Sequence, residues 1–173
     1  MTPSWLEPLL IQGRTRSLSA QSWLLRQGEA QPLFYYLHEG IARAVWHSEN
    51  GTERIKEFYF PGECCFLYLN WLTETTADYG LQLLTAARIS EIPLRLLDEP
   101  AHQPAKIALM RQQLIYKEKK EQMLLLNNPG QRYRYMQLHF PDWESRLTQK
   151  DLAAWIGISP VSLSRIRARL NKG

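Results

Sequence analysis

The residues with the clearest chemical purpose lie near the C-terminal end of the sequence. Between positions 159 and 170, small side chains alternate with three arginines, Arg165, Arg167 and Arg169. A guanidinium can donate two hydrogen bonds to the O6 and N7 atoms of guanine, or it can bind a backbone phosphate. Small neighbouring side chains let a helix approach base edges closely. The segment therefore suggests recognition of double-stranded DNA.

Signals for two short helices surround these arginines. Thr148 and Asp151 form a capping pair that opens the first helix, and Gly157 ends it. Ser159 can cap a second helix whose first position is Pro160, a residue with a helical φ and no N–H to lose. Two helices joined by a short turn that contains glycine are typical of a helix-turn-helix.

The second helix can be divided into an inner and an outer face. Leu163, Ile166 and Leu170 recur at helical spacing and are expected to pack inward. We expect Arg165 to contact a base, and Arg167, Arg169 and Lys172 to contact phosphates. The predicted DNA-binding residues are Thr148, Gln149, Ser159, Val161, Ser162, Ser164, Arg165, Arg167, Arg169 and Lys172.

The distribution of charge agrees with this interpretation. Residues 131–173 contain eight Lys and Arg against three acidic residues, an excess of five, whereas the whole chain has a net charge of +4. A basic end is the electrostatic footprint of a surface that meets phosphate, although a soluble basic face would have the same composition.

The sequence gives little support for an enzyme, a metal site or a bound cofactor. It has no Gly-rich phosphate loop and no nucleophile elbow. Cys64 and Cys65 are neighbours, which suits neither a disulfide nor a metal site, and they are expected to be buried. The histidines are scattered, at His38, His47, His102 and His139.

Size and composition predict a packed globular protein. The chain has 173 residues, of which 45% are hydrophobic. No apolar stretch approaches the roughly 18 to 20 residues that cross a bilayer, and Met1 to Leu10 lacks the order of a signal peptide. A cytoplasmic protein without membrane contact is expected.

From about Leu18 to Pro93 the pattern is that of short strands separated by turns. Asn50-Gly51, between two β-rich segments, is the strongest hairpin signal. This spacing predicts an antiparallel sandwich or roll. The expected strands are Ser22–Arg26, Leu33–Leu37, Ile41–His47, Arg54–Phe60, Tyr79–Leu84 and Arg88–Leu94.

A long helix is predicted from Pro104 to Leu126, where good helix formers dominate. Its apolar stripe of Ile107, Met110 and Leu114 is interrupted by a charged run at 117–121 and returns at Leu124. We expect this stripe to form a homodimer. The alternative is a helix packed on its own β domain, with the charged run facing water.

Asn127 to Gly130 ends this helix, and Asn128 can cap a following short helix over Arg132 to Phe140. The predicted organisation is a β domain over 1–98, a dimerisation helix over 99–128 and a DNA-binding domain over 129–173.

The segment from Gly157 to Arg167 resembles the recognition segment of the Crp/Fnr family of bacterial regulators. Gln131 to Pro141 is similar to the stretch that leads into that family's helix-turn-helix. Gly28 to Glu63 is similar to its β-roll, in which glycines recur at the turns. The resemblance implies an α+β fold: an antiparallel β-roll, a long dimer helix and a winged-helix DNA reader. It also implies a homodimer on a two-fold DNA site, with RNA polymerase as a further partner.

The effector site departs from the family pattern. The family's phosphate cassette runs from a Gly-Glu pair to an arginine followed by a small hydroxyl residue. Gly62 and Glu63 match its start, but Ala77 and Asp78 stand where the arginine and the hydroxyl should be. The loss of the cation and the added carboxylate oppose binding of a phosphate. We therefore expect no response to cyclic nucleotides, and the effector stays unknown.

Three further departures concern ligands and DNA. No cysteine precedes Cys64, so an iron–sulfur cluster has too few ligands. Val161 replaces the glutamate of many relatives, which favours contact with a thymine methyl group. The sequence also ends at Gly173, which leaves no length for a full wing.

Two other functions remain open at this point. The β-roll could sense a small molecule, or the chain could dimerise without reading DNA; salt-sensitive DNA binding distinguishes the second from the main hypothesis. Aromatic residues that could line an apolar pocket, or simply fill the core, are Trp23, Tyr35, Tyr36, Trp46, Phe58, Tyr59, Phe60, Tyr68, Trp71 and Tyr79.

Overall fold

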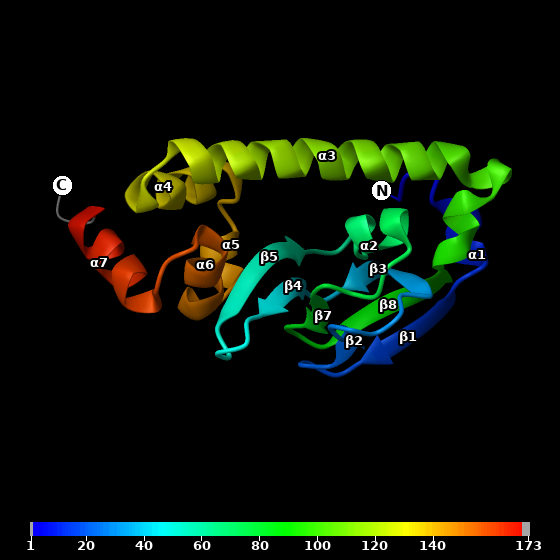
Figure 1. The fold of residues 1–173 in the computed structure, drawn as a ribbon, viewed down its shortest axis with the longest axis horizontal. Coiled ribbons are helices and arrows are strands. Elements are labelled where there is room, and N and C mark those ends of the chain that lie inside the picture. Colours follow the sequence, from blue (N-terminus) through cyan, green and yellow to red (C-terminus); the bar gives the residue numbers. More distant parts are fainter. Residues whose placement is uncertain (1, 171–173) are drawn as a thin grey trace. The chain divides into compact units, whose positions relative to one another are not determined.

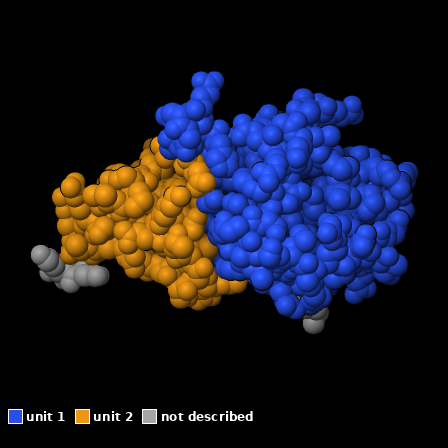
Figure 2. Space-filling view, turned by 90° about the horizontal axis from the view of Figure 1, so that it is seen from below, with its two compact units in different colours: residues 1–52, 56–112 blue, residues 53–55, 113–173 orange. Residues whose placement is uncertain are grey.

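The computed structural model describes residues 2–170 and divides the chain into two compact units. Unit 1 contains residues 1–52 and 56–112, and unit 2 contains residues 53–55 and 113–173 (Figure 2).

The β-roll consists of two four-stranded sheets whose paired strands run antiparallel (Figure 1). This confirms the antiparallel roll that the turn spacing predicts. The first sheet has the order β1 (Arg14–Leu18), β8 (Ala87–Pro93), β3 (Leu33–Glu39) and β6 (Cys64–Cys65). The second has the order β2 (Trp23–Leu25), β7 (Gly80–Leu83), β4 (Ala42–His47) and β5 (Glu53–Tyr59).

Strand β3 is buried on both faces because each face meets a different hydrophobic cluster. Tyr35 and Leu37 belong to the cluster inside the roll. Phe34 and Tyr36, at the alternate positions, belong to a second cluster with Leu9 of helix α1 (Glu7–Ile11). Full burial of a Leu or Phe side chain stabilises the fold by about 1.5–3 kcal/mol, so these alternate positions fix the register of the central strand.

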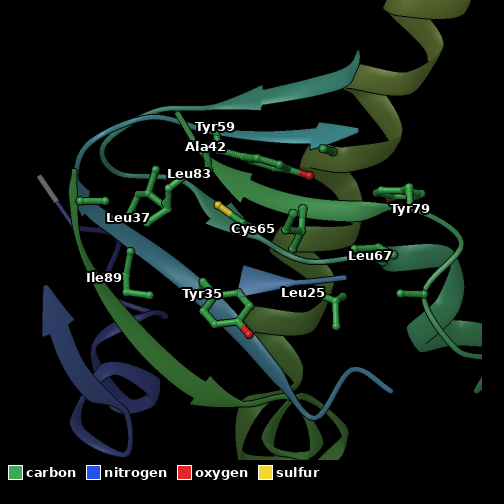
Figure 3. Packing of buried hydrophobic residues seen from close by; sticks show 14 residues of the cluster. Leu25, Tyr35, Leu37, Ala42, Tyr59, Cys65, Leu67, Tyr79, Leu83 and Ile89 are labelled. Atoms are coloured by element: carbon green, nitrogen blue, oxygen red, sulfur yellow. The ribbon is translucent and has the colours of Figure 1, made fainter. Parts of the chain in front are cut away.

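Side chains fill the interior of the roll (Figure 3). Three tyrosines contribute to it, and each hydroxyl has a partner. The Tyr35 hydroxyl donates to the Leu24 carbonyl oxygen at 2.5 Å, and Lys56 Nζ lies 2.6 Å from the Tyr79 hydroxyl. The Tyr59 hydroxyl is 3.3 Å from Glu57 Oε2. Burial raises the pKa of Tyr35 to about 12 and that of Tyr59 well above its usual value, so both hydroxyls stay protonated.

Some elements of unit 1 are absent from the sequence-based prediction. Strand β1 is exposed over Arg14–Ser17, so it lacks the apolar alternation that reveals a half-buried strand. Pairing with β8 holds it in place, together with an ion pair of 2.9 Å between Arg16 and Glu91. The other missed elements are short: α1, β6, α2 (Tyr68–Thr73), and the 3-10 helices η1 (Leu94–Asp98) and η2 (Pro100–His102).

The long helix α3 (Gln103–Leu126) confirms the predicted one within a residue. Ile107, Met110 and Leu114 are exposed, so this stripe is available for contact with a second chain. Leu124, where the sequence predicts that the stripe returns, is half-buried in the single chain, whereas its neighbour Leu125 is 75% exposed. Leu125 follows Ile107 by eighteen positions, five turns of an α-helix, whereas a strict heptad count drifts away from this face. Within residues 2–170, no helix is both long and apolar enough to span a bilayer.

The two cysteines lie on β6 as free thiols; Cys65 is completely buried, as expected, whereas Cys64 is only half-buried. Burial raises the pKa of Cys64 to about 12 and that of Cys65 well above its usual value. Because the thiolate is the reactive form, we expect neither thiol to react with Ellman's reagent in the native protein at mildly alkaline pH. Both should react after denaturation in urea. Rapid modification of the native protein would contradict this burial.

Candidate nucleic-acid interface

The region that follows α3 begins with helix α4 (Pro129–His139). It starts three residues before the predicted Arg132, although its predicted cap is confirmed. Asn128 Oδ1 accepts from the Gln131 N–H at 3.0 Å, and Gln131 Oε1 accepts from the Asn128 N–H at 2.9 Å. This capping box satisfies two N–H groups that the first turn would leave unpaired.

Helices α6 (Gln149–Ile156) and α7 (Pro160–Leu170) form the predicted helix-turn-helix. The Thr148 hydroxyl accepts from the Asp151 N–H at 3.1 Å and caps α6. Gly157 has φ +85°, a left-handed conformation that glycine adopts without strain. Ser159 Oγ accepts from the Ser162 N–H at 3.1 Å and caps α7.

Apolar packing fixes these helices. Leu152, Ala153 and Ile156 of α6 are buried, and Leu163 of α7 is completely buried. Trp155 adds a contact that the apolar spacing does not indicate: its ring meets Trp143, on the short helix α5 (Trp143–Arg146), at a centroid distance of 5.0 Å. The helix that carries the arginines is therefore held by a defined core.

The outer face of α7 has the composition that close approach to DNA requires. Val161 is 60% exposed, and Ser164, Arg165 and Arg169 are also exposed. Within residues 2–170, the side chains of Arg165 and Arg169 make no hydrogen bond or ion pair. Their guanidinium groups are free to bind an external acceptor.

Arg167 is placed differently from the other two arginines. Its side chain is 39% exposed, and its Nη2 atom lies 3.4 Å from Oε1 of Glu144 on α5. The spacing of the arginines alone does not reveal this partner.

Several predicted contact residues hold the motif together. Gln149 Nε2 donates to the Pro160 carbonyl oxygen at 3.0 Å and so links α6 to α7. Thr148, Ser159 and Ser162 take part in the caps, and Thr148 and Ser159 remain exposed. Lys172 lies outside the described residues.

Arg132 has a structural role that sequence reasoning missed. Its guanidinium donates to the carbonyl oxygens of Leu124 and Asn127 at 2.8 and 2.9 Å, where α3 ends. It also donates to the Ile156 carbonyl oxygen at 3.3 Å, where α6 ends. Helix C-termini leave such carbonyls unpaired and favour a cation. Arg132 therefore contributes to the positive charge of this region without being free for DNA.

Comparison with known proteins identifies the chain. Residues 15–100 match the cyclic nucleotide-binding domain family. The anaerobic regulatory protein of Haemophilus influenzae is 24% identical over 178 residues, which cover 92% of this chain and 67% of that protein. The chain belongs to the Crp/Fnr family.

Solved structures share the fold. The c-di-GMP-responsive global regulator CLP of Xanthomonas campestris superposes with a TM-score of 0.76 at 18% identity, over 97% of this chain and 91% of that one. A CRP-family transcriptional regulator of Thermus thermophilus gives a TM-score of 0.74 at 17% identity, over 91% and 84% of the two chains.

The positions of the Crp/Fnr phosphate cassette have local roles in this chain. Gly62 has φ +96°, and its N–H donates to the Leu37 carbonyl oxygen at 2.8 Å. Glu63 Oε2 accepts from the Phe60 N–H at 2.7 Å. The Ala77 side chain belongs to the interior cluster, whereas Asp78 is exposed.

Within the described residues, no group of three or more His, Cys, Asp and Glu side chains could hold a metal ion.

Proposed function

We propose that this Crp/Fnr protein is a homodimeric transcription regulator that binds a two-fold DNA site through α7. The observation that carries the proposal is the exposed face of α7, where Val161, Ser164 and the unpaired Arg165 stand on a helix with a fixed core. The relatives' names, among them a transcriptional activator, support the regulatory role. RNA polymerase would be a further partner of a chain that activates transcription.

The exposed stripe of α3 supports the dimer. Ile107 and Leu114 are 63% and 60% exposed, an unusual state for large apolar side chains on one face of a helix. A two-fold dimer would cover this face and present two copies of α7. Their half-sites should lie about 10 bp apart, one turn of DNA.

The decisive experiment selects bound sequences from a random DNA pool with the purified protein. A two-fold consensus with half-sites one turn apart is the expected result. A pool that stays random, or a protein that dimerises without salt-sensitive DNA binding, would contradict the proposed function and favour an interaction protein.

We further propose that cyclic nucleotides do not regulate this protein. An anionic cyclic phosphate needs a cation and hydrogen-bond donors, and the sequence from Leu72 to Leu84 contains neither Lys nor Arg. The tyrosines that fill the roll interior support the same proposal, because a nucleotide would have to displace them.

Calorimetric titration with millimolar cyclic AMP or cyclic GMP should therefore give no binding heat and no gain in DNA affinity. Lys56 is the cation to test if this fails, because its Nζ already reaches Tyr79 in the interior cluster. Saturable micromolar binding would refute the proposal, and its loss in Lys56→Met would identify Lys56 as the cation that holds the phosphate.

A further inference from the structure

Helical geometry separates Arg167 from the arginines that face outward. Successive residues of an α-helix are rotated by about 100°. Arg167 follows the completely buried Leu163 by four positions and so lies on nearly the same face. Arg165 follows Leu163 by two positions and lies on the opposite side. The two arginines therefore leave α7 on nearly opposite sides of the helix.

The partner of Arg167 is a carboxylate that is itself held by other helices. Glu144 Oε1 accepts from the Tyr133 hydroxyl and lies 3.4 Å from Arg167 Nη2. Gln137 Nε2 lies 3.2 Å from Glu144 Oε2 and 3.1 Å from the Tyr133 hydroxyl oxygen. Tyr133 and Gln137 are on α4, Glu144 is on α5 and Arg167 is on α7. One carboxylate therefore connects three helices.

The surroundings of Glu144 and Arg167 favour a stable ion pair over one between two fully exposed side chains. Tyr133 is 3% exposed, and the Glu144 side chain is 27% exposed. Burial and the neighbouring Glu144 raise the pKa of Tyr133 to about 12, so its hydroxyl remains a donor at neutral pH. If Arg167 turned outward to a phosphate, the carboxylate would lose its cationic partner while still half-buried.

We infer that Glu144 is a positioning residue for DNA recognition: it holds Arg167 against α4 and so fixes the orientation in which α7 presents Arg165. Arg167 is then an anchor of the recognition helix, that is, a residue that attaches α7 to the neighbouring helices. We therefore no longer expect it to contact a phosphate. The inference rests on the proposed DNA-binding function.

Salt dependence distinguishes an anchor from a phosphate contact. Each phosphate neutralised by a protein cation adds about 0.9 to the slope of log affinity against log salt concentration. Arg167→Gln should keep the wild-type slope, whereas the matched control Arg169→Gln, on the same helix without a partner, should lose about 0.9. A loss of about 0.9 in Arg167→Gln would overturn the inference.

Specificity gives the second measurement. Arg167→Gln and Glu144→Gln should each lower the ratio of affinities for the selected site and for random DNA, by roughly 10-fold if α7 shifts enough to disturb one base contact. The double variant should be no worse than either single one. The ratio is the proper quantity because removal of the Glu144 charge strengthens binding to all DNA. An unchanged ratio in Glu144→Gln would also overturn the inference.

Unfolding in urea tests the connection without DNA. The shift in midpoint for the double variant Glu144→Gln with Arg167→Gln should be smaller than the sum of the single shifts, because either change alone breaks the pair. The control pair Glu144→Gln with Arg169→Gln should be additive. If the wild-type protein fails to select a DNA sequence, the proposed function is wrong, but the unfolding measurements still test whether Glu144 and Arg167 are coupled. Additive shifts in the first pair would refute that coupling.

Discussion

Leu114→Asp is expected to convert the protein to a monomer and to lower its affinity for the two-fold site by at least about 100-fold. In a two-fold dimer the same patch of each copy meets the other, so the substitution would bring two carboxylates together in an apolar seam. Leu114 is 60% exposed in the single chain, so the change leaves the core of the subunit intact. Loss of the second half-site removes the effective-concentration gain of about 10²- to 10⁴-fold.

Gln112→Asp is the matched control for this substitution. Gln112 is also exposed on α3, but it precedes Leu114 by two positions and lies on the other side of the helix. This variant should remain dimeric in light scattering and should protect both half-sites in a footprint. A monomeric wild type at micromolar concentration, or a Leu114→Asp variant that stays dimeric, would refute dimerisation through this face.

The helix-turn-helix could be predicted because its signals are local. Thr148, Gly157 and Ser159 each satisfy a backbone requirement of a residue a few positions away. The capping box at Asn128 is local in the same way. Strand β1 could not be predicted, since its stability depends on pairing with β8 about seventy positions later and its own side chains are mostly exposed.

The role of Arg167 shows a different limit of sequence reasoning. Its four-residue spacing from Leu163 already places it on the inner face of α7. An arginine is nevertheless expected at the surface, because a buried charge is costly without a partner. That partner, Glu144, comes from another helix, and only the folded chain shows that Tyr133 and Gln137 hold it in place.

The effector region was predicted only in part. The resemblance to the family places Ala77 at the position of the cassette arginine, but the filling of the roll interior depends on strands that are far apart in the chain. The expected repulsion by Asp78 has less support, because Asp78 is exposed whereas Ala77 faces the interior.

Arg165→Ala is expected to weaken binding to the selected site by about 1–3 kcal/mol, or roughly 5- to 150-fold, because a bidentate contact to one base is lost. Arg165 is exposed and has no partner within residues 2–170, so its removal should leave the thermal stability of the protein unchanged. Selection from a random pool should show relaxed preference at one position of each half-site.

The comparison of selected and random DNA decides whether Arg165 reads a base. Arg169→Ala, the control, should weaken binding to both kinds of DNA by similar factors, as expected of a phosphate contact. Arg165→Ala should weaken the selected site far more than random DNA, since one lost charge affects all sequences alike but one lost base contact affects only the matching ones. If Arg165→Ala instead reduced both affinities equally, Arg165 would be a phosphate contact, and base recognition would have to come from Val161, Ser164 or another residue on the same outer face.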